Sequence, residues 1–175
     1  MTKKSILEAT ARMLGLTVDF SEESDLSAAL GVCCDYVLNE LSTQHEDLLT
    51  TETIDSSDKK LMFSRFRENV VHVRAVKLNG RKVGFTLYPD RIQIGRDGEY
   101  EVAYTYSINS PLLTERLKLP PKYTEEILSL GVAAEYLYRT GYERDAAMFS
   151  DRYFAALKNL SVVKRNVVLP VRRFL

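Results

Sequence analysis

The pattern of apolar and polar positions predicts two amphipathic helices at the start of the chain, over residues 5–14 and 24–44. For the first helix, Ser5 followed by Glu8 predicts a capping box, and Gly15 stands where a helix commonly ends. In the second helix the apolar positions recur every three or four residues, at Leu26, Leu30, Cys33, Val37 and Leu41. Each helix would bury this one face and leave the other in water.

Strand signals dominate residues 68–107. Val70–Leu78 is rich in β-branched residues, Asn79-Gly80 is typical of a type I′ turn, and Lys82–Tyr88 returns as the partner strand. We therefore expect an antiparallel β-meander of about four strands in this region.

The segments on either side of this hairpin are less regular. Arg91–Ile94 and Glu99–Ser107 predict a second hairpin around a glycine-containing turn. Residues 46–60 are polar and favour either a loop or an edge extension of the sheet. Leu61–Phe66 could add a fifth strand, so the pattern leaves the structure of residues 46–66 open.

Two more helices are expected at 122–139 and 143–159. The first follows a Pro-Pro dipeptide, and Gly141 supplies a tight turn between the two. Gly131 costs about 1 kcal/mol of helix stability relative to alanine, and close helix packing would compensate for that cost. Small residues suit such packing, and the two segments contain Ala133, Ala134, Ala146, Ala147, Ala155 and Ala156.

A basic, β-branched tail, residues 161–175, follows the last predicted helix. The chain has no acidic residue after Lys158, and a free tail of this kind would expose apolar, strand-forming sequence. Such a tail either docks on another chain, by strand addition or in a groove, or completes the protein's own sheet as a last strand. We expect the docking role, carried by Val163, Lys164, Arg165, Val167, Val168, Leu169, Arg172, Arg173, Phe174 and Leu175.

These elements predict an α+β fold. It would consist of an α-helical bundle with a C-terminal helical hairpin, a small antiparallel β-meander and an extended C-terminal arm. The length of 175 residues suits one domain, which we place at residues 1–160, with residues 161–175 as the arm.

Charge and targeting signals favour a chain without a membrane partner. It has 24 Lys and Arg against 24 Asp and Glu, so its net charge does not steer it to nucleic acid or acidic membranes. No signal peptide is recognisable, and no apolar run approaches the roughly 20 residues that span a bilayer. Cys33 and Cys34 are adjacent, a strained geometry for a disulfide, which fits synthesis in a reducing cytosol.

Candidate catalytic and ligand-binding residues are few. His45 and His72 lack partners at metal-ligand spacing, and Cys33 and Cys34 suit a helix core better than a metal pair or a nucleophile. Neither a phosphate-binding glycine loop nor a G-x-S-x-G motif occurs. We therefore expect no enzyme activity, no catalytic residue, no metal site and no cofactor.

Aromatic residues on the predicted strands support two interpretations. They are Phe85, Tyr88, Tyr100, Tyr104 and Tyr106. Such a sheet face could stack nucleic-acid bases, as in a nucleic-acid-binding module. Alternatively, the rings could supply the core and subunit contacts, which we expect because tyrosine is common in strands.

The order of the elements is that of a known family. An early helix, Ala28–Leu41, precedes the strand regions Val70–Phe85 and Glu99–Tyr106. The segments Gly131–Leu137 and Ala146–Leu157 then combine small and apolar residues on two helices. This layout resembles the head-to-tail adaptor proteins of tailed bacteriophages, also called connector or head-completion proteins.

The resemblance implies a structural role in the virion neck. Members of this family form a ring, usually dodecameric, that joins the portal protein to the tail and continues the DNA channel. Genomic DNA passes through without sequence-specific contact, and the C-terminal arm commonly extends along the portal. The chain would be made in the host bacterial cytoplasm and assembled at the capsid portal vertex. The alternatives are another neck or tail-completion protein, such as a stopper, and the nucleic-acid-binding module.

Overall fold

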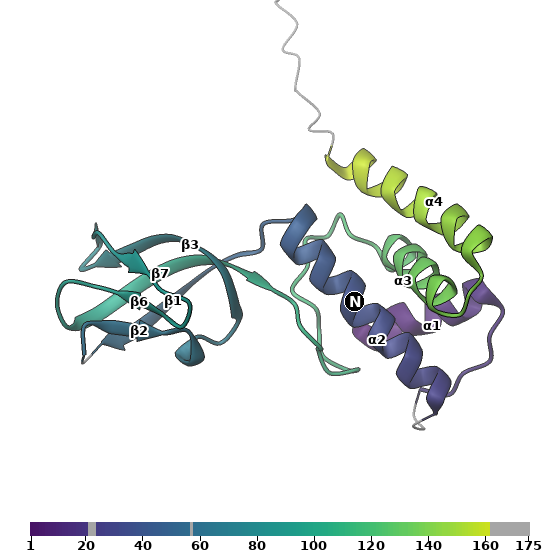
Figure 1. The fold of residues 1–175 in the computed structure, drawn as a ribbon, viewed down its shortest axis with the longest axis horizontal. Coiled ribbons are helices and arrows are strands. Elements are labelled where there is room, and N and C mark those ends of the chain that lie inside the picture. Colours follow the sequence, from purple (N-terminus) through teal and green to yellow (C-terminus); the bar gives the residue numbers. More distant parts are fainter. Residues whose placement is uncertain (21–23, 57, 162–175) are drawn as a thin grey trace, which may run out of the picture.

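The computed structural model describes residues 1–20, 24–56 and 58–161, which form a helical lobe and a β-lobe (Figure 1). The helical lobe contains α1 (Lys3–Leu14), α2 (Asp25–Glu40), the short helix η1 (Leu41–His45), α3 (Glu125–Arg139) and α4 (Glu143–Ser161). The β-lobe contains β1 (Leu49–Ser56), β2 (Lys60–Met62), η2 (Phe63–Arg65), β3 (Asn69–Leu78), β4 (Arg81–Lys82), β5 (Thr86–Leu87), β6 (Arg91–Gln93) and β7 (Gly98–Ser107). The predicted α+β class is confirmed.

Helix α1 begins earlier than the sequence predicted. Thr2, rather than Ser5, is the capping residue: its Oγ1 accepts a hydrogen bond from the Ser5 backbone N–H at 3.2 Å. Ser5 Oγ accepts in return from the Thr2 N–H at 3.1 Å, so the reciprocal box pairs Thr2 with Ser5 instead of Ser5 with Glu8. Gly15 ends the helix as predicted, with a positive φ of 68° that glycine adopts at little cost.

Helix α2 matches most of its predicted range but changes geometry near its end. Residues Leu41–His45 form one π-helical turn. Ser42 Oγ and Thr43 Oγ1 donate to the backbone carbonyls of Leu38 and Asn39, at 2.9 and 2.8 Å. Side-chain bonds of this kind compete with the regular backbone ladder, and they accompany the altered turn that places His45 at the junction with the β-lobe.

All the strand pairs in the β-lobe are antiparallel, in two sheets of order β1-β7-β3-β4 and β2-β6-β5. One core joins them: Tyr104 is fully buried on β7, as are Leu61 on β2 and Ile92 on β6. The rest of this core comprises Leu48, Ile54, Phe66, Val76, Leu78, Ile94, Tyr100, Val102 and Tyr106. The segment 46–66, left open by the sequence, therefore supplies strands to both sheets.

The predicted β-meander and its second hairpin are wrong, because the strands form two sheets in which most neighbours are distant in sequence. Arg91–Gln93 pairs with β2 and β5, whereas β7 lies between β1 and β3. The Ile94 N–H donates to the Lys59 carbonyl at 3.0 Å, which holds the end of β6 next to β2 rather than β7. The Asn79-Gly80 turn is confirmed, with positive φ at both residues. The predicted return strand Lys82–Tyr88 is wrong: β4 pairs with β3 over only two positions, and Thr86–Leu87 pairs with β6 in the other sheet.

The helical lobe has its own core, and of the described residues only half-buried Ile108 and Leu119 pack against both cores. Its buried residues are Ile6, Leu7, Ala11, Phe20, Leu30, Cys33, Cys34, Val37, Leu38, Leu41, Leu117, Tyr123, Leu128, Leu130, Val132, Tyr153 and Leu157. The connection after β7 lies along the N-terminus, where the Leu117 N–H donates to the Met1 carbonyl at 3.1 Å. Assignment of residues 1–160 to a single domain stays a prediction.

Gly131 lies at the closest approach of three helices. A Cβ at this position would lie 3.0 Å from the Tyr153 ring of α4 and 3.0 Å from Val37 of α2. We expect Gly131→Leu to lower the free energy of unfolding by about 2 kcal/mol, because a larger side chain overpacks this contact. In Gly131→Ala, a gain of about 1 kcal/mol in helix propensity offsets the crowding. Urea unfolding followed by circular dichroism measures both, and equal stability of the two variants would contradict the close contact.

Candidate interaction surfaces

The ten arm residues predicted to bind a partner lie outside the described residues. The structure does show the helix that leads to them. Helix α4 packs on α3, burying Ala146, Tyr153 and Leu157, and exposes most of its other side chains. Met148 is 52% exposed, and Phe154, six residues later, is 45% exposed although its ring lies beside that of His45.

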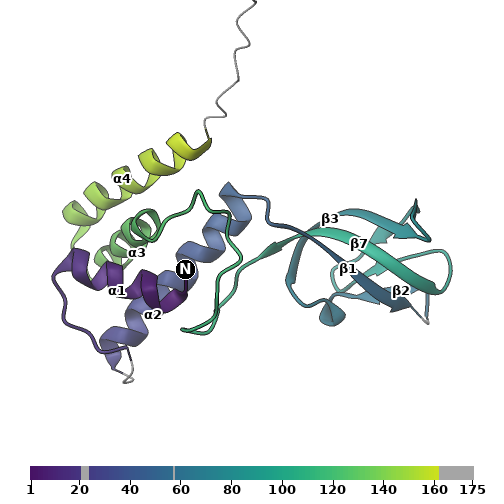
Figure 2. The ribbon, with the colours of Figure 1, turned by 180° about the vertical axis from the view of Figure 1, so that it is seen from behind.

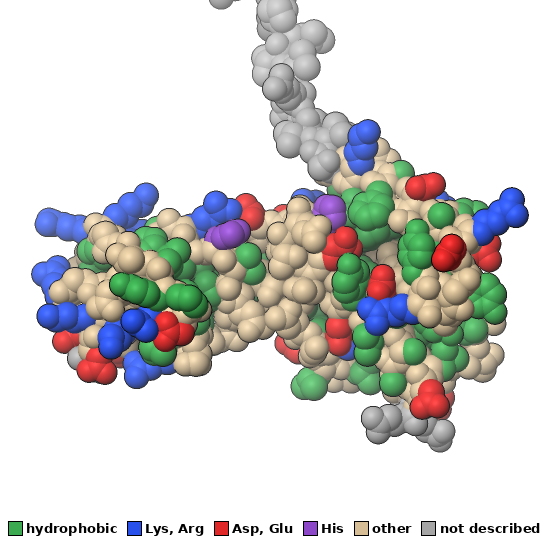
Figure 3. Space-filling view, in the orientation of Figure 1, with side chains coloured by type: hydrophobic (Ala, Val, Ile, Leu, Met, Phe, Trp, Pro, Cys, Tyr) green, Lys and Arg blue, Asp and Glu red, His purple; other side chains and the backbone are tan. Residues whose placement is uncertain are grey.

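A second exposed apolar surface lies on α2. Val32 and Tyr36, one turn apart, are 52% and 49% exposed. The Arg139 guanidinium lies 6.0 Å from the centre of the Tyr36 ring and is held by Glu135 through a hydrogen bond of 2.6 Å. Figure 3 shows hydrophobic side chains over the helical lobe and many Lys and Arg side chains around the outer end of the β-lobe.

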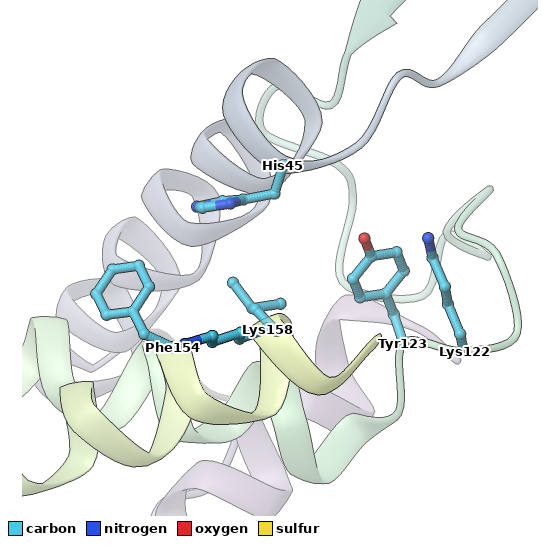
Figure 4. A pocket seen from close by; sticks show the side chains of 6 residues that line it. His45, Lys122, Tyr123, Phe154 and Lys158 are labelled. Atoms are coloured by element: carbon cyan, nitrogen blue, oxygen red, sulfur yellow. The ribbon is translucent and has the colours of Figure 1, made fainter. Parts of the chain in front are cut away.

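A cavity of about 270 Å³ lies where the end of η1, the start of α3 and the last turns of α4 meet (Figure 4). It is lined by His45, Lys122, Tyr123, Phe154, Leu157 and Lys158. The His45 and Phe154 rings are 6.1 Å apart and tilted by 54°. This contact ties the end of α4 to the residues that immediately precede β1.

Glu46 anchors the segment before α3 to the end of η1. Its Oε2 accepts a hydrogen bond from the Tyr123 hydroxyl at 2.7 Å and pairs with Lys122 Nζ at 2.5 Å. Burial acts to raise the pKa of Glu46, but the hydrogen bonds from Lys122 and Tyr123 outweigh it and lower that pKa. The pKa of Tyr123 is raised by burial and by its bond to Glu46.

This network predicts a pH-dependent contribution to stability. A carboxyl whose pKa is lowered on folding stabilises the protein above its unfolded pKa of about 4.3, and the contribution is lost as pH falls through the folded value. We expect Glu46→Gln to lower the free energy of unfolding by about 1 kcal/mol at pH 7, with the deficit shrinking in acid. Urea titrations from pH 3 to pH 7 measure the difference.

Glu99→Gln is the matched control, because Glu99 is exposed on β7 and makes no ion pair in the described part of the chain. A Glu46→Gln deficit that stays constant down to pH 3 would contradict the role of the ionised carboxylate.

The two cysteines are fully buried in the helical core. Burial raises the pKa of Cys33 to about 11 and that of Cys34 to about 12. Both thiols are therefore protonated at neutral pH, which favours the core interpretation over the nucleophile. Residues 1–20, 24–56 and 58–161 contain no group of three or more His, Cys, Asp and Glu that could hold a metal ion.

The strand aromatics divide between the core and the surface. Tyr100, Tyr104 and Tyr106 are buried in the β-lobe, so they serve the core as predicted and are closed to base stacking. Tyr88 remains exposed, with the Arg91 guanidinium 4.6 Å from its ring centre. Stacking of nucleic-acid bases on all five of these aromatic residues together is therefore excluded.

No family model matches the chain, and no curated protein is significantly similar to it. Among the helices of the described ranges, none is long and apolar enough to cross a membrane.

Proposed function

We propose that this protein is a structural subunit of the neck of a tailed bacteriophage, an adaptor that forms a ring between the portal and the tail. The observation that carries the proposal is the exposure of large apolar side chains on two different helices, Val32 and Tyr36 on α2 and Met148 and Phe154 on α4. A closed ring is built from heterologous contacts, in which two different faces of each subunit meet.

The finer fold arrangement belongs to this proposal. The four helices act as the bundle, α3 and α4 as its C-terminal hairpin, and the two antiparallel sheets of the β-lobe as the β-structure of an adaptor. Two hydrophobic cores that share, among the described residues, only Ile108 and Leu119 suit a subunit whose lobes contact different partners. The helical lobe contacts the neighbouring subunits of the ring, the arm binds the portal, and the ring offers a surface to a tail or stopper protein.

Charge supports protein contacts over nucleic-acid binding. The chain has a net charge of zero, and DNA passes the ring without sequence-specific contact. The protein acts in the virion as a structural component, with no catalytic step and no cofactor.

Sedimentation of lysate from the native source, followed by mass spectrometry, tests the proposal. Co-sedimentation of this protein with a portal and a capsid is the expected result, and subunit counting then separates an adaptor from a stopper. A small species free of capsid would overturn the assignment to the neck.

A further inference from the structure

Among the strands that the structure describes, β1 has one edge without a partner. It is the terminal strand in the order β1-β7-β3-β4 and pairs with β7 over all 8 of its residues without a shift in register. A long, regular edge of this kind offers its free backbone groups to any further strand.

The register identifies the free groups. The Tyr106 N–H donates to the Leu48 carbonyl at 3.0 Å, so residue 48 faces β7. Because bonding alternates along an antiparallel strand, Thr50 and Glu52 also face β7, whereas Thr51 and Thr53 direct their N–H and C=O groups outward. Leu49 and Asp55 follow the outward pattern, and Arg65 Nη1 reaches the Asp55 carbonyl at 3.4 Å.

The opposite edge of the same sheet is protected. It consists of the two-residue β4 and of the part of β3 that β4 does not cover. Strand β3 has two register shifts, between Val70 and His72 and between Val73 and Ala75. Bulges twist an edge strand and hinder the approach of another. Residues 49–56 contain no bulge, proline or lysine, so β1 is the edge open to strand addition.

We propose that residues 162–175 of the same chain pair with this free edge of β1. Helix α4 ends on the side of the helical lobe that faces the β-lobe, as both views show (Figures 1 and 2). Phe154 contacts His45, and Lys158 lines the same cavity, so the last turns of α4 lie beside the residues that precede β1. The pairing that we propose is parallel, with Val162 opposite the start of β1.

Length and sequence fit this pairing. Residues 162–169 precede Pro170, which lacks a backbone donor, and match the 8 residues of β1. Four of these eight positions are the β-branched Val162, Val163, Val167 and Val168, which favour a strand. Fully extended, residues 162–175 reach at most roughly 50 Å, well beyond the roughly 27 Å of β1.

Charge also fits. Residues 46–58 contain five acids and no Lys or Arg, whereas residues 158–175 contain five cations and no acid. In the described part of the chain, Asp55 and Asp58 make no ion pair. A parallel segment brings Arg172 and Arg173 towards this end of β1. The pairing gives hydrogen-bond partners to the outward backbone groups of β1 and at the same time buries apolar side chains of residues 162–175.

Amide exchange measured by NMR, on the full chain and on a chain that ends at Ser161, tests the proposal. The outward amides of Leu49, Thr51 and Thr53 should exchange about tenfold or more faster in the shorter chain, because each loses a hydrogen bond. The amides of Thr50 and Glu52 bond to β7 and should not change. Equal exchange of the outward amides in both chains would overturn the pairing.

Substitutions in the full chain provide an independent test. The double variant Val167→Pro, Val168→Pro removes a donor from either side of the segment and should free the same amides. Val171→Pro, beyond Pro170, is the matched control and should leave them protected. Failure of the double variant to release them would also reject the proposal.

Sedimentation of the full chain distinguishes the source of the added strand. We expect the full chain to sediment as a monomer. A full chain that is a dimer, and becomes a monomer when residues 162–175 are removed, would overturn the pairing within one chain and assign the contact to a second copy. No portal is present in any of these experiments, so the inference stands or fails separately from the proposed function.

Discussion

Replacing Tyr104 with alanine is expected to lower the free energy of unfolding by about 4 kcal/mol, the largest stability loss we foresee for one substitution. Tyr104 is fully buried on β7 and meets the Phe66 ring edge-on, with the ring centres 5.0 Å apart. Its hydroxyl donates to Glu52 Oε2 at 2.8 Å, which links β7 to β1. Alanine would leave a cavity in the core that joins the two sheets, and would remove that link.

Tyr104→Phe isolates the hydroxyl. It keeps the ring and should cost only about 1 kcal/mol. Glu52 keeps a partner in that variant, because its carboxylate also accepts from the Arg67 N–H at 3.2 Å. Urea unfolding at pH 7 measures both variants, with NMR chemical shifts reporting each lobe separately. A loss below about 1 kcal/mol for Tyr104→Ala would contradict the packing of Tyr104 in this core.

Helices were predictable because their determinants are local. The apolar stripe of α2 and the turn at Gly141 involve residues that are neighbours in sequence. The start of α1 was missed by two residues because Thr2 and Ser5 form the same reciprocal bonds that the sequence suggested for Ser5 and Glu8. The π-helical turn at the end of α2 gave no signal in the apolar spacing.

Strand pairing was less predictable because it joins residues distant in sequence. The turn at Asn79-Gly80 was found from its own chemistry. The pairing of β1 with β7, Leu49 opposite Thr105, spans more than half of the lobe's sequence, and alternation alone does not select a partner. The threonines of β1 also made this strand difficult to predict, because its outer face is exposed to solvent.

The candidate surfaces were partly visible in the sequence. Val32 and Tyr36 fall off the inward stripe of α2, and large apolar residues on the polar side of a helix are a sign of an exposed patch. The cavity around His45 had no such sign. Its other lining residues, Lys122 and Phe154 among them, come from segments that only the tertiary fold brings together.

Deletion of residues 161–175 is expected to abolish portal binding while leaving the described core folded. The core residues of both lobes lie before Ser161, so the shorter chain should keep its circular dichroism spectrum. The arm carries apolar residues and the four cations Lys164, Arg165, Arg172 and Arg173. A partner that buries the apolar side chains supplies most of the binding energy, and the cations add a part that salt weakens.

Two substituted full-length chains separate these contributions. Serine at Val163, Val167, Val168 and Leu169 should remove binding nearly as completely as the deletion, whereas glutamine at the four cations should weaken it and flatten its salt dependence. Pull-down with purified portal across a salt series measures each. Normal portal binding by the deleted chain would disprove the role of the arm.

If the arm also pairs with β1 in the free subunit, portal binding must release it, and the outward amides of Thr51 and Thr53 should then exchange as fast as they do after truncation.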